Sequence, residues 1–129
     1  MHDCHLYEYG VLRIVPRVER EEFINAGVIV FCKKLKLVRC RYELNAEKIR
    51  ALHPDADVEM IGRNLEAFIQ IAHGDRTSKS PIARLDAPER FRWLTATRST
   101  LIQVGKTHPG FTPDAENITN VLFEKLVRG

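Results

Sequence analysis

The stretch "DADVEMIGRNLEAFIQIAHG", residues 55–74, decides the fold of this chain. Its apolar residues recur at steps of three and four residues, which is the period of an amphipathic α-helix. Asp55 can cap the start of this helix, and Gly74 follows its last turn. The helix has one apolar stripe, made of Val58, Ile61, Leu65, Phe68, Ile69 and Ala72. Because the stripe is broad enough to lie on a sheet, we expect a layered protein in which this helix covers strands.

Segments on both sides of this helix predict strands. Residues 6–15, "LYEYGVLRIV", are rich in aromatic and β-branched residues and end before a proline. Residues 27–31, "GVIVF", and 34–44, "KLKLVRCRYEL", predict a β-hairpin with a short basic turn. Residues 98–104, "RSTLIQV", predict a fourth strand, which the segment 105–110, "GKTHPG", interrupts.

Three further helices are predicted from their capping residues. Asn45 can cap a helix that stops at Pro54, and Asp86 with Glu89 has the spacing of a capping box. Thr112 can cap the last helix, with a proline at its first position. We expect the buried face of that helix to consist of Ile118, Val121, Leu122, Leu126 and Val127.

The order of these elements, strands first and helices mostly later, favours an α+β fold over a regular βαβ alternation. We predict a mainly antiparallel sheet of about four strands, covered by helices, in a single domain spanning residues 1–129. The chain has the length of one domain, and its 44% hydrophobic and 29% charged residues are ordinary for a soluble globular protein.

The predicted location is the cytoplasm, without membrane association. No apolar run approaches the roughly 18 residues of a membrane span. The N-terminus, "MHDCHLYEYG", has acids and histidines where a signal peptide has basic and then apolar residues. Cys4, Cys32 and Cys40 form no C-x-x-C unit and are predicted to be free thiols.

The segment "REEFINAG", residues 20–27, offers a first candidate site. Glu21, Glu22 and Asn25 can form a carboxylate–amide group that positions a water or a cation. Asn25 and Gly27 are also residue types that make turns and bulges where a strand begins. We interpret the segment as a strand entrance, which becomes a functional site only if another segment folds against it.

Two other segments give little support for metal or nucleic-acid chemistry. The cluster "HDCH", residues 2–5, lacks the second ligand pair that a zinc site needs, so we predict no metal and no cofactor. The hairpin residues Lys33, Lys34, Lys36, Arg39 and Arg41 can track a nucleic-acid backbone. Only Tyr42 is near enough in sequence to add stacking, and lysines on a hairpin edge also discourage aggregation.

The segment "RFRWLTATRSTLIQVGKTHPG", residues 90–110, is the richest in groups that bind anions. We predict that a ligand or a partner contacts Arg92, Arg98, Ser99, Gln103 and His108, with Glu22 or Asn25 nearby. Polar side chains on an otherwise apolar strand need partners when they are buried.

Taken with "YGVLRIVP", "REEFINAGVIVF", "ALHPDAD", "RFRWLTATRSTLIQ", "THPG" and "LFEKLV", the chain resembles the bacterial domain-of-unknown-function family 3037. These segments cover nearly the whole length in the same order. The resemblance implies no established activity, but it implies a protein partner or a shared pathway, because similar proteins are often encoded beside a HipA-like kinase.

Three hypotheses follow for the function. The first is a non-catalytic protein-binding or regulatory module that partners a HipA-like kinase. The alternative is a small enzyme or ligand-binding protein for an anionic small molecule, with Arg98 and Gln103 as binders and His108 as a proton carrier. A weaker alternative is nucleic-acid binding through the hairpin 33–41. The oligomeric state stays open.

Overall fold

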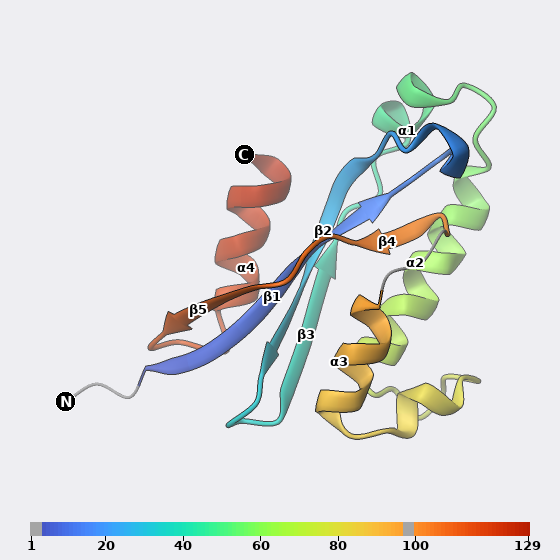
Figure 1. Ribbon diagram of the computed structural model, residues 1–129. Coiled ribbons are helices and arrows are strands. Elements are labelled where there is room, and N and C mark those ends of the chain that lie inside the picture. Colours follow the sequence, from blue (N-terminus) through green and yellow to red (C-terminus); the bar gives the residue numbers. More distant parts are fainter. Residues whose placement is uncertain (1–3, 97–99) are drawn as a thin grey trace.

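A computed structural model describes residues 4–96 and 100–129 of the chain (Figure 1). Its sheet contains β1 (His5–Ile14), β2 (Ile24–Cys32), β3 (Leu37–Tyr42), β4 (Ile102–Val104) and β5 (His108–Thr112). The strand order is β3-β2-β1-β4, with β5 also paired to β1, and every pair is antiparallel. The predicted α+β class and the predicted hairpin of β2 and β3 are confirmed.

The strand β5 was not predicted, because Pro109 and Gly110 disfavour strands. β4 pairs with the end of β1, from Leu12 to Ile14, whereas β5 pairs with its start, from His5 to Tyr9. The two short strands therefore share one edge of β1. Proline is tolerated there because an edge strand needs fewer of its N–H groups for the ladder.

The helix α2 (Val58–Ala72) covers one face of the sheet, as its stripe predicts. Ile61, Leu65 and Ala72 are buried in the main core against β1, β2 and β3. The residue that caps this helix is Asp57, not Asp55, because its carboxylate is close enough to accept a hydrogen bond from the N–H of Met60 at 3.0 Å. Gly74 follows the helix with a φ of +66°, a conformation that favours glycine.

Two shorter helices begin where the capping residues predict. Asn45 accepts from the N–H of Lys48 at the start of α1 (Ala46–Leu52). Asp86 accepts from the N–H of Glu89 at the start of α3 (Ala87–Thr95). Single turns of 3₁₀-helix lie at Val18–Arg20 and Pro81–Arg84.

The opposite face of the sheet packs against α4 (Ile118–Phe123) and a π-helical turn, Glu124–Arg128 (Figure 1). The predicted start of this helix at Thr112 is wrong, because Thr112 ends β5 and its hydroxyl accepts from the N–H of Asp114. Val121 is half exposed, whereas Leu122 and Phe123 are buried. Ile118, Leu126 and Val127 are partly buried against the same core, so the predicted face is confirmed except at Val121, and Phe123 is an unpredicted member of it.

All three cysteines are free, as predicted, and burial raises the pKa of Cys40 to about 12. Within residues 4–96 and 100–129, none of the helices is both long enough and apolar enough to span a membrane.

Candidate functional site

A row of three polar side chains crosses the sheet at the end of β1. Arg13 on β1 lies opposite Asn25 on β2 and opposite Gln103 on β4. Directly opposed residues place their side chains on the same face of a sheet. The register between β1 and β2 shifts between Leu12 and Arg13, which is a β-bulge of the kind that re-aims a side chain. An arginine is therefore flanked by two amides, on the face away from α2.

Beside this row lies a cavity of about 230 Å³, which we call the Arg13 pocket. It is lined by Arg13, Val15, Val18, Glu21, Phe23 and Gln103. The Arg13 guanidinium lies 4.1 Å from the centre of the Phe23 ring, a cation–π distance. Phe23 is 44% exposed, so its ring forms part of the open wall of the pocket.

The Arg13 guanidinium is fixed in place but incompletely hydrogen-bonded. Its Nε atom is buried and has no hydrogen-bond partner in the described part of the chain, where Arg13 also forms no ion pair. A Cβ atom at Gly105 would lie 2.9 Å from the Arg13 Cζ, so the guanidinium occupies space that only glycine leaves there. An unsatisfied buried donor costs about 1–3 kcal/mol, which a bound acceptor would recover.

Gln103 and Glu21, the other two polar residues of the pocket, each donate a hydrogen bond to a backbone carbonyl. Gln103 donates its amide Nε2 to the carbonyl of Thr100 at 2.8 Å, which directs its amide group along β4. Glu21 has a φ of +57°, and its N–H donates to the carbonyl of Val18. The 3₁₀ turn at Val18–Arg20 thus places the Glu21 residue beside the end of β1.

The segment "REEFINAG", residues 20–27, was expected to form a functional site only if another segment folds against it. Another segment does fold against it, because Gln103 lines the same pocket as Glu21 and Phe23. The predicted Glu22 does not line that pocket. It accepts a hydrogen bond from Arg20 at 2.6 Å, which lowers the pKa of its carboxyl group.

Two other predicted binding residues, His108 and Arg92, do not line the Arg13 pocket. His108 is exposed on β5 and contacts Tyr9, with 5.5 Å between the ring centres. Arg92 lines a different cavity, of about 310 Å³, between α3 and the sheet, together with Glu8 and Lys33. Arg98 and Ser99 lie outside the described residues.

An exposed apolar pair lies on the same strand face as Glu8, which lines that second cavity. Leu6 on β1 lies opposite Phe111 on β5, and their side chains are 52% and 72% exposed. Leu6 and Glu8 share a face because they are two residues apart on one strand. We call Leu6, Glu8, Lys33, Arg92 and Phe111 the ribbon surface. Figure 1 shows β5 and the start of β1 as a two-stranded extension beside the helical layer.

The basic hairpin is only partly free. Lys33, Lys34 and Lys36 are exposed at its turn. Arg41 donates to the side chain of Asn120 at 3.1 Å and lies 4.1 Å from the centre of the Phe123 ring. Arg39 lies 3.8 Å from the carboxylate of Glu116. The two arginines therefore attach β3 to the C-terminal segment, whereas the three lysines of the hairpin turn form no ion pair within residues 4–96 and 100–129.

The sequence prediction missed Arg13 and Phe23. Arg13 stands between Leu12 and Ile14, which are both fully buried in the core on the other face. A lone arginine inside a strand of aliphatic residues was the available signal, because a strand alternates its faces and the arginine must then face away from the core. Within the described residues, no group of three or more His, Cys, Asp or Glu side chains is arranged to hold a metal.

A family model described as "Protein of unknown function (DUF3037)" matches residues 9–127 of the 129-residue chain. The chain belongs to this family. Neither a search of curated proteins nor a search of solved structures gives a match. In this DUF3037 protein, three segments on which the resemblance rests meet at the Arg13 pocket. "YGVLRIVP" supplies Arg13, "REEFINAGVIVF" supplies Glu21 and Phe23, and "RFRWLTATRSTLIQ" supplies Gln103.

Proposed function

We propose that this DUF3037 protein is a binding module that holds a carboxylate in the Arg13 pocket. The observation that carries the proposal is Arg13, whose side chain lines a cavity and whose buried Nε atom has no hydrogen-bond partner in the described part of the chain. A guanidinium binds a carboxylate through two parallel hydrogen bonds, and its Nε–H is one of the two donors commonly used.

The rest of the pocket favours a small ligand with a single negative charge. Phe23, Val15 and Val18 offer apolar contact, while Gln103 offers an amide. Glu21 carries a negative charge on the same wall, so it repels dianions and accepts hydrogen bonds from an ammonium or hydroxyl group. The expected ligand is a carboxylate that also carries a hydrogen-bond donor, as an amino acid does.

The contacts around the Arg13 pocket support binding without catalysis. The enzyme alternative uses His108 as the proton carrier, but His108 is exposed beside Tyr9 and is not among the residues that line the Arg13 pocket. A general base must reach the proton that it moves, directly or through one water.

The test is an NMR titration of the ¹⁵N-labelled protein with acetate, glycine and N-acetylglycine at constant ionic strength. The Arg13 Nε–H signal should shift, with glycine bound more tightly than acetate. Arg13→Gln should weaken binding about tenfold or more, since a hydrogen bond to a charged group contributes about 1.5–3 kcal/mol. The matched control is Arg17→Gln, because Arg17 is exposed and, among the described residues, forms an ion pair with Glu19 alone. No shift at Arg13, or equal losses in both variants, would refute the proposal.

A second candidate function, docking of a protein partner, is favoured by the ribbon surface. Leu6 and Phe111 form an exposed apolar pair, and β5 pairs with β1 alone among the described strands. A free strand edge beside an apolar surface can accept an extended peptide by adding one more strand. We propose that a HipA-like kinase, the partner implied by the family resemblance, docks such a segment here.

This docking is tested by co-expression with a HipA-like kinase encoded beside the gene. Phe111→Ser should reduce co-purification strongly, while Val121→Ser, a half-exposed position on α4, should leave it unchanged. If the unmodified protein fails to co-purify with the kinase at both low and moderate salt, the proposal is contradicted. Arg13→Gln should leave docking intact, so the two candidate functions can fail separately.

A further inference from the structure

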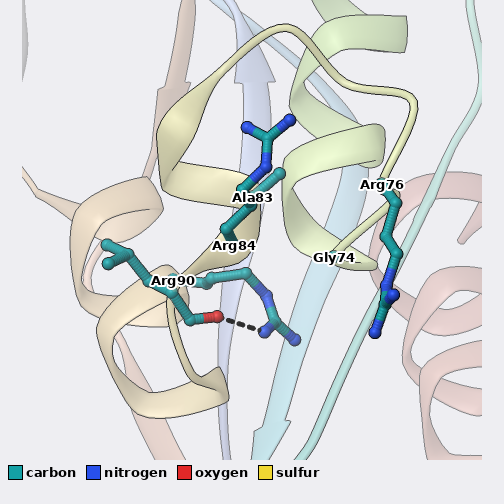
Figure 2. Close-up of a pocket in the computed structure, with 6 residues that line it drawn as sticks. Gly74, Arg76, Ala83, Arg84 and Arg90 are labelled. Atoms are coloured by element: carbon teal, nitrogen blue, oxygen red, sulfur yellow. Dashed lines mark hydrogen bonds between the residues drawn. The ribbon is translucent and has the colours of Figure 1, made fainter.

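A third cavity, of about 390 Å³, lies where α2 ends, far along the chain from Arg13 (Figure 2). It is lined by Gly74, Arg76, Ala83, Arg84, Leu85 and Arg90, and we call it the Arg90 pocket. Its three arginines come from three elements: the loop after α2, the 3₁₀ turn Pro81–Arg84, and α3. No family motif or charge pattern in the sequence predicts that they meet.

The Arg90 guanidinium is held in place by the backbone around it. Its Nη1 donates to the carbonyl of Leu85 at 2.7 Å, as Figure 2 shows. A Cβ atom at position 74 would lie 3.2 Å from the Arg90 Cζ, so the glycine there allows the guanidinium to approach closely. The Nε atom of Arg90 is nevertheless buried without a hydrogen-bond partner in the described residues.

The positive charge of this pocket is not neutralised. Among the described residues, none of Arg76, Arg84 and Arg90 forms an ion pair with a carboxylate. Arg84 donates to the carbonyl of Ser80 at 3.4 Å, and Arg76 makes no hydrogen bond within that part of the chain. The neighbouring Asp75 accepts hydrogen bonds from the N–H and the hydroxyl of Thr77, which engage its carboxylate.

The three side chains do not contribute equally. Figure 2 shows Arg76 and Arg90 extending toward the same side of the Gly74 turn, whereas the Arg84 guanidinium points away from them. Arg76 and Arg90 are therefore the pair that can contact one anion, and Arg84 adds positive potential at the rim. Two guanidiniums without a counter-charge favour an anion with more than one negative charge, because each can form charge-assisted hydrogen bonds to it.

We propose that the Arg90 pocket binds the phosphate group of a small phosphorylated molecule, with Arg76 and Arg90 as its ligands. A volume of about 390 Å³ falls within the range of roughly 300–1,000 Å³ that small-molecule sites occupy. The pocket therefore has room for more than the phosphate itself. Surfaces that bind nucleic-acid backbones add aromatic stacking, and the six lining residues include no aromatic side chain.

The test is isothermal titration calorimetry with inorganic phosphate, pyrophosphate and 5′-AMP at constant ionic strength. Pyrophosphate should bind more tightly than phosphate, and tighter binding of 5′-AMP than of phosphate would show that the pocket contacts the rest of the molecule. Arg76→Gln and Arg90→Gln should each weaken pyrophosphate binding about tenfold or more, as expected for loss of a hydrogen bond to a charged group. Arg84→Gln should have a smaller effect.

Controls separate this site from diffuse attraction and from the Arg13 pocket. Arg63→Gln removes an exposed arginine on α2 outside the pocket and should leave pyrophosphate binding unchanged, as should Arg13→Gln. If Arg90→Gln does not fold, Arg76→Gln decides, because Arg76 is exposed and makes no hydrogen bond in the described chain. Absence of pyrophosphate binding would overturn the proposal. Equal losses in Arg63→Gln and Arg76→Gln, or oligonucleotide binding that both variants weaken alike, would overturn it too.

Discussion

The Arg13 pocket and the Arg90 pocket each contain an arginine whose Nε atom is buried without a hydrogen-bond partner in the described chain, but the two arginines have different surroundings. At Arg13, the neighbours include one carboxylate, one amide and one aromatic ring, so positive and negative charge balance. At Arg90, the neighbours include two more arginines and no acid. The same side chain is therefore expected to select a single carboxylate in one place and a multiply charged phosphate in the other, because the neighbouring groups decide which total charge is stabilised.

The two pockets also differ in how they are built. Arg13 is positioned by strand pairing on both sides of β1, so its place depends on the register of the whole sheet. Arg90 is positioned by the first turn of α3 and by the chain reversal at Gly74, so its place depends on contacts within residues 74–90 and not on the register of the sheet. Three predictions follow from this difference.

The largest effect is expected from Gly27→Ala in β2. A Cβ atom there would collide with the carbonyl oxygen of Arg41 and lie 2.9 Å from the Cα of Tyr42, and these backbone atoms cannot turn aside. We expect the free energy of unfolding to fall by about 1–3 kcal/mol, the usual range for overpacking. Urea unfolding monitored by circular dichroism measures this loss.

The same variant should distinguish the two pockets. Gly27 pairs with Leu12 beside the bulge that positions Arg13, so carboxylate binding should weaken while pyrophosphate binding persists. Gly62→Ala is the matched control, since its Cβ would meet only the flexible Leu44 side chain at 3.2 Å. Helix propensity predicts a gain of up to about 1 kcal/mol for this control. Equal destabilisation by both substitutions would contradict the prediction.

A smaller and more local effect is expected from Asp86→Ala. The Asp86 carboxylate caps α3, and loss of such a cap costs about 1 kcal/mol. Because Arg90 lies in the first turn of α3, pyrophosphate affinity should fall while carboxylate binding at Arg13 is retained. Asp57→Ala removes the equivalent cap of α2, at the end opposite Gly74, and should cost similar stability without changing pyrophosphate affinity. Calorimetry and thermal unfolding on both variants provide the comparison.

The smallest effect concerns the pH dependence of stability and arises from His73, which precedes Gly74 of the Arg90 pocket. The Nε2 atom of His73 accepts a hydrogen bond from the N–H of Cys40 at 3.1 Å. Partial burial lowers the pKa of His73 from its ordinary 6.5, and the charges of Arg39 and Arg90 lower it further, whereas Asp75 opposes them.

Since the pKa is lower in the folded state, the unfolded chain takes up the proton more readily. The contribution of His73 to the free energy of unfolding should therefore be fully present above pH 6.5 and should be lost as the pH falls below that value. His73→Gln should remove this decrease, whereas His108→Gln, at an exposed position on β5, should retain it. Urea unfolding between pH 5 and pH 8 tests the claim, and identical slopes in both variants would disprove it.

Much of the fold could be predicted because its signals are local. The stripe of α2, the caps Asn45 and Asp86, and the strand character of β1 to β3 each depend on residues within a few positions of one another. Errors occurred where a longer-range contact overrode the local signal. Pro109 and Gly110 form part of β5 because the edge of β1 is available, and Thr112 ends that strand instead of beginning a helix.

The candidate site was only partly predictable for the same reason. Gln103, Asn25 and Glu21 were singled out as polar groups near strands, but the residue that connects them, Arg13, was not. Its role becomes visible only when β2 and β4 are known to pair on either side of it.

By itself, the sequence determined the family, the α+β class, the helix caps and the apolar faces, since periodicity and capping act over one or two turns of chain. The tertiary structure alone decided which arginines have unpartnered donors and which groups surround them. Residues 13 and 103 meet through strand register, residue 21 joins them through the 3₁₀ turn Val18–Arg20, and residues 76 and 90 meet through a chain reversal. Such meetings depend on contacts between separate elements of the fold, which no local pattern specifies.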